Sequence, residues 1–216
     1  MGGIKKPYLD LAGKPILAHT LLAFQQCPLV DSVFVVAAKG DEQKCVHDII
    51  TPYGLNKVHQ VITGGETRQE SVFNGLQKLA SNTDMVIVHD CARPFVTEEM
   101  IVNTLESADK WGAATLALPV KDTIKEADDG NFVVKTLNRQ RLWLIQTPQT
   151  FRYDLILRAH LYACENNIQV TDDASLIEAL GIQRVKLVMG TSGNIKITTP
   201  SDLAIARAIL EAGGMP

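Results

Sequence analysis

The chain has 216 residues, 46% hydrophobic and 21% charged, enough to bury the core of one α/β domain spanning residues 1–216. A formal net charge of −3 argues against a nucleic-acid-binding surface, so any phosphate ligand must be held by locally placed Lys and Arg side chains. The four cysteines lack CxxC or zinc-ligand spacing, no signal peptide opens the chain, and no apolar run approaches the roughly 20 residues of a membrane span. We therefore expect a cytoplasmic protein with free thiols and no membrane or nucleic-acid partner.

Apolar runs alternate with helix-period segments along the first half of the chain. The runs are short, continuous and rich in β-branched residues, which is typical of a parallel sheet covered on both faces. This alternation predicts a doubly wound, mostly parallel α/β fold, whose right-handed crossovers bring the strand carboxyl ends to one ligand-binding edge. We expect strands at residues 32–38, 58–63, 85–89 and 114–118, and helices at 16–26, 41–50, 68–79, 97–111, 174–180 and 200–212. Thr97 and Thr171, each followed by two acidic residues, are the expected N-caps of the helices that start there.

The alternation stops between residues 120 and 144. Residues 121–126 and 131–137 are predicted to be strands, and residues 128–131 (DDGN) supply the turn chemistry of a hairpin. Because an isolated two-stranded hairpin is marginally stable in water, we expect it to form an arm that packs on a second subunit. The sequence thus predicts a homodimer joined through this inserted arm.

Polar side chains concentrate where the predicted strands end. Asp90 and Arg93 follow the strand at 85–89, and a carboxylate there suits Mg²⁺, which keeps few protein ligands and shares phosphate oxygens. Gly64 and Gly65 precede a helix, so the backbone can approach a nucleotide closely and the helix N-terminus favours anions. Simpler interpretations are a structural ion pair between Asp90 and Arg93 and an ordinary β-to-α turn at the glycines.

Eight short motifs follow one another between residues 5 and 202. In chain order they are KPYL, GGETRQESV, HDCARP, PVKDT, RQRLW, TPQ, TDDAS and NIKIT. Each is weak alone, but the complete order resembles the 2-C-methyl-D-erythritol 4-phosphate cytidylyltransferase family over nearly the whole chain. The resemblance implies a Rossmann-like nucleotidyltransferase fold with a dimerisation arm. It also implies cytidylyl transfer from CTP to 2-C-methyl-D-erythritol 4-phosphate, with release of pyrophosphate, in isoprenoid precursor biosynthesis.

The resemblance assigns roles to individual residues. Lys6 and Lys196 match two lysines that stabilise phosphates, Asp90 matches the residue linked to Mg²⁺, and Arg93 matches a ligand of the sugar phosphate. Arg139 matches a catalytic residue on the arm that reaches the active site of the neighbouring subunit. The other matches are substrate contacts: with CTP for Gly65, Glu66, Arg68 and Ser71, with the neighbouring sugar phosphate for Thr123, and within the same site for Thr147.

The start of the chain departs from the family. Members open with a hydrophobic strand and a glycine-rich loop that wraps the triphosphate, whereas this sequence begins Met1-Gly2-Gly3, which resembles the end of that loop. We expect the strand, most of the loop and its arginine to be missing from this sequence, which should leave a gap in the core where a central strand belongs.

Two alternative functions stay open on the sequence. Ribitol-5-phosphate cytidylyltransferase shares the CTP machinery, and only a few side chains of the acceptor pocket separate the two activities. A non-catalytic nucleotide- or sugar-phosphate-binding relative would result from loss of the glycine-rich loop. A dinucleotide-dependent dehydrogenase is disfavoured because no G-x-G-x-x-G motif follows a first strand.

Overall fold

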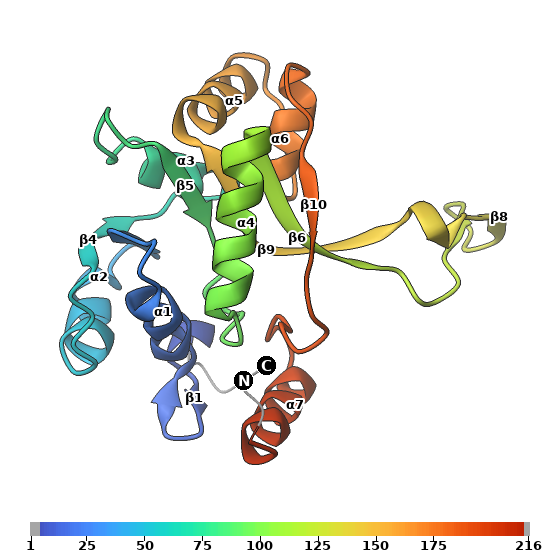
Figure 1. The fold of residues 1–216 in the computed structure, drawn as a ribbon. Coiled ribbons are helices and arrows are strands. Elements are labelled where there is room, and N and C mark those ends of the chain that lie inside the picture. Colours follow the sequence, from blue (N-terminus) through green and yellow to red (C-terminus); the bar gives the residue numbers. More distant parts are fainter. Residues whose placement is uncertain (1–4, 214–216) are drawn as a thin grey trace.

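The computed structural model describes residues 5–213, so the Met1-Gly2-Gly3 segment lies outside the described residues. Figure 1 shows a body of helices around a central sheet, from which a long arm projects. The strands are β1 (Asp10–Leu11), β2 (Lys14–Pro15), β3 (Val33–Ala37), β4 (Val58–Thr63), β5 (Met85–Val88), β6 (Ala113–Pro119), β7 (Lys125–Ala127), β8 (Val133–Thr136), β9 (Trp143–Arg152) and β10 (Lys186–Met189). The helices are α1 (Ile16–Gln26), α2 (Glu42–Cys45), α3 (Arg68–Leu76), α4 (Glu98–Trp111), α5 (Tyr153–Glu165), α6 (Asp173–Leu180) and α7 (Pro200–Glu211), with shorter turns η1 (Lys6–Tyr8), η2 (Val46–Ile50) and η3 (Arg139–Arg141).

The central sheet has the strand order β10-β6-β9-β5. β10 pairs with β6 in parallel, whereas β9 runs antiparallel to both β6 and β5. The prediction of a mostly parallel sheet is therefore corrected to a mixed sheet. The reason is that the chain leaves β6, forms the arm and returns directly into the sheet without a helical crossover, and such a return produces an antiparallel neighbour.

A second, two-stranded parallel sheet contains β3 and β4. Among the described residues, no hydrogen-bonded strand joins this pair to the central sheet. Over the described residues, β3 and β4 therefore form a sheet of their own beside the central one. Strands β3 and β4 lie within one residue of their predicted bounds, because both segments are rich in β-branched residues.

Helices cover both faces of the central sheet. One core cluster packs α3, α5 and α6 against β6 and β9, and includes Phe151, Ile156 and Ile177, all fully buried. Another packs α1 and α4 against the opposite face around Ile101 and Leu116. The result is a three-layer α/β/α arrangement (Figure 1). No helix between residues 5 and 213 is long and apolar enough to cross a bilayer.

Capping residues define the helix ends near the site. Thr97 caps α4 by accepting a hydrogen bond from the Met100 N–H, as predicted. Asp172 rather than Thr171 caps α6, and Gly181 ends that helix with a φ of 72°. The first residue of α6 is therefore Asp173, a position that matters for the site.

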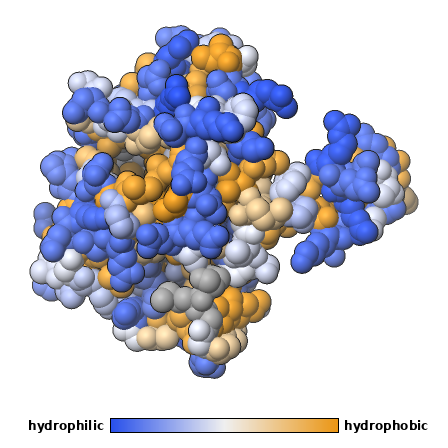
Figure 2. Space-filling model, viewed as in Figure 1, coloured by the Kyte–Doolittle hydropathy of each residue, from blue (hydrophilic) through white to orange (hydrophobic). Residues whose placement is uncertain are grey.

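The arm contains β7 and β8, which pair antiparallel as predicted, although the first strand covers Lys125–Ala127 rather than residues 121–126. Its turn is closed by Asp128 Oδ1, which accepts hydrogen bonds from the N–H groups of Gly130 and Phe132. Both strands are exposed along their whole length, and Phe132, Val133 and Val134 are 74%, 63% and 57% exposed. Figure 2 shows apolar surface on this arm and on the body beside its base.

Candidate functional site

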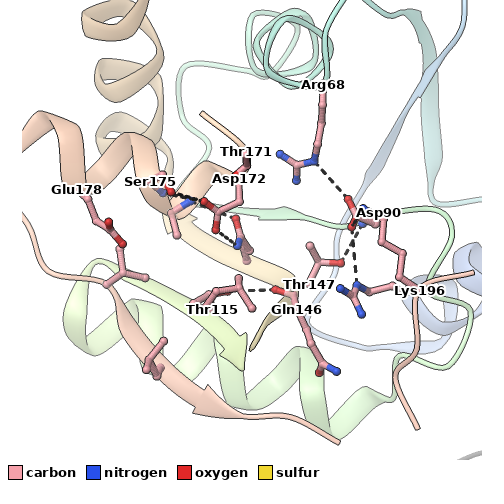
Figure 3. Close-up of a pocket in the computed structure, with 16 residues that line it drawn as sticks. Arg68, Asp90, Thr115, Gln146, Thr147, Thr171, Asp172, Ser175, Glu178 and Lys196 are labelled. Atoms are coloured by element: carbon pink, nitrogen blue, oxygen red, sulfur yellow. Dashed lines mark hydrogen bonds and ion pairs between the residues drawn. The ribbon is translucent and has the colours of Figure 1, made fainter. Parts of the chain in front are cut away.

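A polar cavity of about 400 Å³ opens where β5 and β9 meet the N-terminus of α6. Figure 3 shows Arg68 and Lys196 converging on Asp90 at one end of the cavity, with Asp172, Ser175 and Glu178 toward the other end. The cavity thus has a cationic end and a carboxylate-rich end. Its lining residues include Arg68, Asp90, Arg93, Thr147 and Lys196, which the sequence singled out, and Gln149.

Asp90 is the centre of the cationic end. Its Oδ2 lies 2.8 Å from Lys196 Nζ and 3.8 Å from Arg93 Nε, and its Oδ1 lies 3.4 Å from Arg68 Nε. Burial by itself raises the pKa of Asp90, but the hydrogen bond and charge of Lys196 and the charges of Arg68 and Arg93 outweigh it, so the pKa lies below its ordinary value. The carboxylate is therefore ionised at neutral pH and is surrounded by three cations.

Main-chain and side-chain hydrogen bonds hold this end together. The Asp90 N–H donates to Thr147 Oγ1 at 3.0 Å, and Arg93 Nη1 donates to the Asn194 carbonyl at 2.8 Å. Asn194, fully buried, donates from Nδ2 to the Thr147 carbonyl at 3.0 Å. Two loops and strand β9, which are distant in sequence, are thereby joined around Asp90. The contact between Arg93 and the Asp90 carboxylate is long, at 3.8 Å, so Arg93 is not paired tightly with Asp90. This argues against the simpler interpretation of the two residues as a structural ion pair.

The loop between β4 and α3 is held by internal hydrogen bonds, and its residues do not line the cavity. The Gly65 N–H donates to Ser71 Oγ at 3.1 Å, and the Glu66 N–H donates to a carboxylate oxygen of Glu70 at 2.8 Å. A Cβ at Gly65 would collide with the Glu70 side chain, so the turn requires glycine. Of the predicted CTP contacts, only Arg68, the first residue of α3, reaches the cavity.

Lys6 lies in η1 and is exposed. Burial raises the pKa of the Cys91 thiol to about 11, and the charges of Lys196 and Lys6 oppose this shift. Lys6 is therefore within electrostatic reach of the residue that follows Asp90, although it does not line the cavity. The four cysteines are unpaired, as expected.

Arg139 and Thr123 do not join the cavity within one chain. Both are exposed on the arm, and Arg139 Nη1 donates to the Lys121 carbonyl at 2.6 Å. Figure 1 shows that the arm points away from the body, which is consistent with the absence of both residues from the lining of the cavity of their own chain.

Asp173, Gln149 and His160 were not singled out by the sequence analysis. Gln149 is fully buried in β9 and its Oε1 accepts from the Asp173 N–H at 3.1 Å, which fixes the start of α6. Asp173 contacts Arg68, with Nη2 2.7 Å from Oδ2. The signal was present in the TPQ and TDDAS motifs, but the acidic pair was interpreted only as a helix cap.

His89 gives a testable pH dependence. It is partly buried, and its Nε2 lies 3.1 Å from the Arg93 carbonyl. Loss of solvent around the ring lowers the pKa of His89 from 6.5 to about 4, and this hydrogen bond only partly opposes the shift. The unfolded chain therefore binds a proton near pH 6.5 that the folded protein accepts only near pH 4. Unfolding free energy should fall as the pH falls through this window, by about 3 kcal/mol in total. Urea denaturation at pH 7 and pH 4.5 measures the loss.

The control is His89→Gln, which keeps a donor for the Arg93 carbonyl and cannot titrate. We expect its unfolding free energy to change much less between the same two pH values. The pKa values of Asp90 and Asp202 are also shifted, but both are lowered from 3.8. These two carboxylates therefore change the unfolding free energy mainly below this pH window. If the unfolding free energy of the variant fell as much between the two pH values as that of the wild type, the assignment to His89 would be contradicted.

Known proteins match this chain along almost its whole length. The family model for 2-C-methyl-D-erythritol 4-phosphate cytidylyltransferase matches residues 1–212. The chain belongs to this family. A curated member, the 2-C-methyl-D-erythritol 4-phosphate cytidylyltransferase of Pelotomaculum thermopropionicum, is 48% identical over 208 residues, covering 96% of this chain and 87% of that protein.

Solved structures agree with this membership. The 4-diphosphocytidyl-2C-methyl-D-erythritol synthase of Anaerococcus prevotii superposes with a TM-score of 0.88 at 34% identity, covering 98% of this chain and 92% of that one. The 2-C-methyl-D-erythritol 4-phosphate cytidylyltransferase of Thermus thermophilus gives a TM-score of 0.81 at 36% identity, covering 95% and 94%. The resemblance first seen in eight short motifs is thus confirmed, and the chain is a nucleotidyltransferase of the cytidylyltransferase type.

Proposed function

We propose that this chain transfers a cytidylyl group from CTP to 2-C-methyl-D-erythritol 4-phosphate and releases pyrophosphate. The observation that carries the proposal is the family membership of a chain whose motif residues Arg68, Asp90, Arg93 and Lys196 meet at one cavity. The membership favours methylerythritol phosphate over ribitol phosphate as the acceptor. The three cations suit a site in which two polyanions must be brought together.

The reaction is an in-line displacement at phosphorus. A phosphate oxygen of the acceptor attacks the α-phosphorus of CTP, the bond to the β-phosphate oxygen breaks, and pyrophosphate leaves. The attacking oxygen is already anionic, so no general base is required. The protein must position the two substrates and neutralise the charge that grows on the α-phosphate.

The residues divide this work by position. Lys196, which lines the cavity beside Asp90, is suited to stabilise the α-phosphate, and Lys6 in η1 lies within electrostatic reach of Cys91, the residue after Asp90. Arg93 presents a planar guanidinium that matches the phosphate of the acceptor. Arg68 contributes a CTP contact from the first turn of α3. Gly65 and Glu66 in the loop before that helix, together with Ser71 in its first turns, would hold the cytidine.

Asp90 fits a Mg²⁺ ligand. Mg²⁺ is commonly held by one or two carboxylates together with substrate phosphates, and Asp90 is an ionised carboxylate at the phosphate end of the cavity. Between residues 5 and 213, no three His, Cys, Asp or Glu side chains form a cluster that could hold a metal by themselves. When bound, Mg²⁺ would supply charge neutralisation for the phosphate oxygens of CTP.

We also propose that the active enzyme is a homodimer with composite sites. The exposed apolar side chains Phe132, Val133 and Val134 give the arm a surface that favours a protein partner over water. The partner that supplies a complementary site is a second copy of the chain. Arg139 and Thr123 would then reach the acceptor in the neighbouring cavity, where Thr147 lies.

A pyrophosphate-release assay tests the function directly. The chain is mixed with CTP, Mg²⁺ and either 2-C-methyl-D-erythritol 4-phosphate or ribitol 5-phosphate. We expect turnover with the first acceptor and its loss when the metal is chelated. Turnover only with ribitol 5-phosphate would move the assignment to the sister activity. CTP binding without turnover on either acceptor would support a non-catalytic relative instead.

A further inference from the structure

Arg68 lies between two carboxylates at the edge of the phosphate site. Its Nη2 is 2.7 Å from Asp173 Oδ2, whereas its Nε is 3.4 Å from Asp90 Oδ1. The closer partner is therefore Asp173, a residue that the proposed reaction does not use. Asp90, in turn, has its closest contact with Lys196.

Asp173 is a buried carboxylate in a fixed position. Its side chain is 1% exposed, and neither of its oxygens has a hydrogen bond of good geometry, so the contact with Arg68 is an ion pair. The residue begins α6, whose N-terminus favours a negative charge, and its N–H donates to Gln149 Oε1 on β9. Burying a carboxylate has a desolvation cost, and a buried ion pair often adds no net stability. A function other than stability is therefore the better explanation for Asp173 at this position.

A third residue, His160, contacts Asp173. It is fully buried on α5, and its Nε2 lies 3.6 Å from Asp173 Oδ1. Neither ring nitrogen has a hydrogen-bond partner, and the ring stacks on Phe73 with centroids 5.6 Å apart and planes 5° apart. Phe73 belongs to α3, the helix that starts with Arg68. The His160 ring thus lies between Asp173 and the helix that carries Arg68.

We propose that Asp173, supported by His160, is a positioning residue that acts through Arg68. By binding Nη2, Asp173 prevents Arg68 from forming a two-pronged ion pair with Asp90, a geometry that guanidinium and carboxylate otherwise favour. Asp90 then stays available to the phosphates and Mg²⁺, and the remaining N–H groups of Arg68 face CTP. This inference rests on the proposed function, in which Arg68 and Asp90 contact substrate.

A double-mutant cycle tests the inference. Asp173→Asn keeps the shape of the side chain and removes its charge; we expect kcat/KM for CTP to fall about tenfold in the wild-type background. In an Arg68→Ala background the same substitution should change kcat/KM by less than about twofold, because the group through which it acts is gone. A merely structural role would give the same loss in both backgrounds, and that result overturns the inference.

The control is Asp172→Asn, which changes the adjacent carboxylate that contacts Ser175 and Gln149 rather than Arg68. Its effect should be equal in both backgrounds. If Asp173→Asn does not fold, His160→Phe, which keeps a ring beside Phe73, replaces it in the cycle. We expect this variant to show a smaller loss of kcat/KM for CTP, and that loss should likewise disappear in the Arg68→Ala background. Failure of the wild type to convert CTP contradicts the proposed function together with this inference, whereas turnover with equal losses contradicts the inference alone.

Discussion

Replacing Lys196 with alanine should lower kcat by about 10²–10³-fold, the cost of removing a preorganised donor from a developing negative charge. Lys196 Nζ lies 2.8 Å from Asp90 at the cationic end of the cavity, and the side chain is 43% exposed. Because the side chain is not part of the core, the free energy of unfolding should change by no more than about 0.5 kcal/mol. Steady-state kinetics of pyrophosphate release, with urea denaturation of the same variant, separate the two effects.

The matched control is Lys186→Ala. Lys186 is an exposed lysine that begins β10, and it does not line the cavity. Its removal changes the net charge by the same amount and should leave kcat within about twofold, because surface substitutions outside a site have little effect. Equal losses in the two variants would show that overall charge, rather than the placement of Lys196, controls the rate.

Mixing two inactive variants should restore activity if the sites are shared between subunits. Arg139→Ala removes the arm's contribution and Lys196→Ala removes a contribution of the body, so each homodimer is expected to be inactive. In a heterodimer one of the two sites has both residues intact. Random exchange of subunits then restores about a quarter of wild-type activity, since half of the dimers carry one complete site.

Arg141→Ala provides the control for the arm. Arg141 is exposed in the same short turn as Arg139. Its removal tests whether the loss of any positive charge from this turn lowers activity as much as the loss of Arg139. We expect it to keep near-wild-type activity both alone and when mixed with Lys196→Ala. If the mixture of Arg139→Ala and Lys196→Ala stays inactive after subunit exchange has been verified by size and mass, composite sites are contradicted. Full activity of an isolated monomer would contradict them equally.

Much of the secondary structure follows from local sequence alone. The run at Val33–Ala37 is continuous and β-branched, so its strand can be predicted without knowing its neighbours. The helix Ile16–Gln26 has its predicted bounds because its apolar spacing and the proline before it are local signals. The order of the motifs likewise sufficed to indicate the family and to select Asp90, Arg93 and Lys196.

The tertiary structure decided what depends on distant partners. Strand direction is not encoded in a strand's own residues, so only the return of the chain through the arm shows that β9 runs antiparallel between β6 and β5. The pairing of Arg68 with Asp173 joins residues from two helices, and the cap chemistry of TDDAS masked it, because an acid at a helix start has a sufficient local explanation. Local propensity sets which elements form; burial and charge pairing between elements, which no short window contains, set which side chains meet at the site.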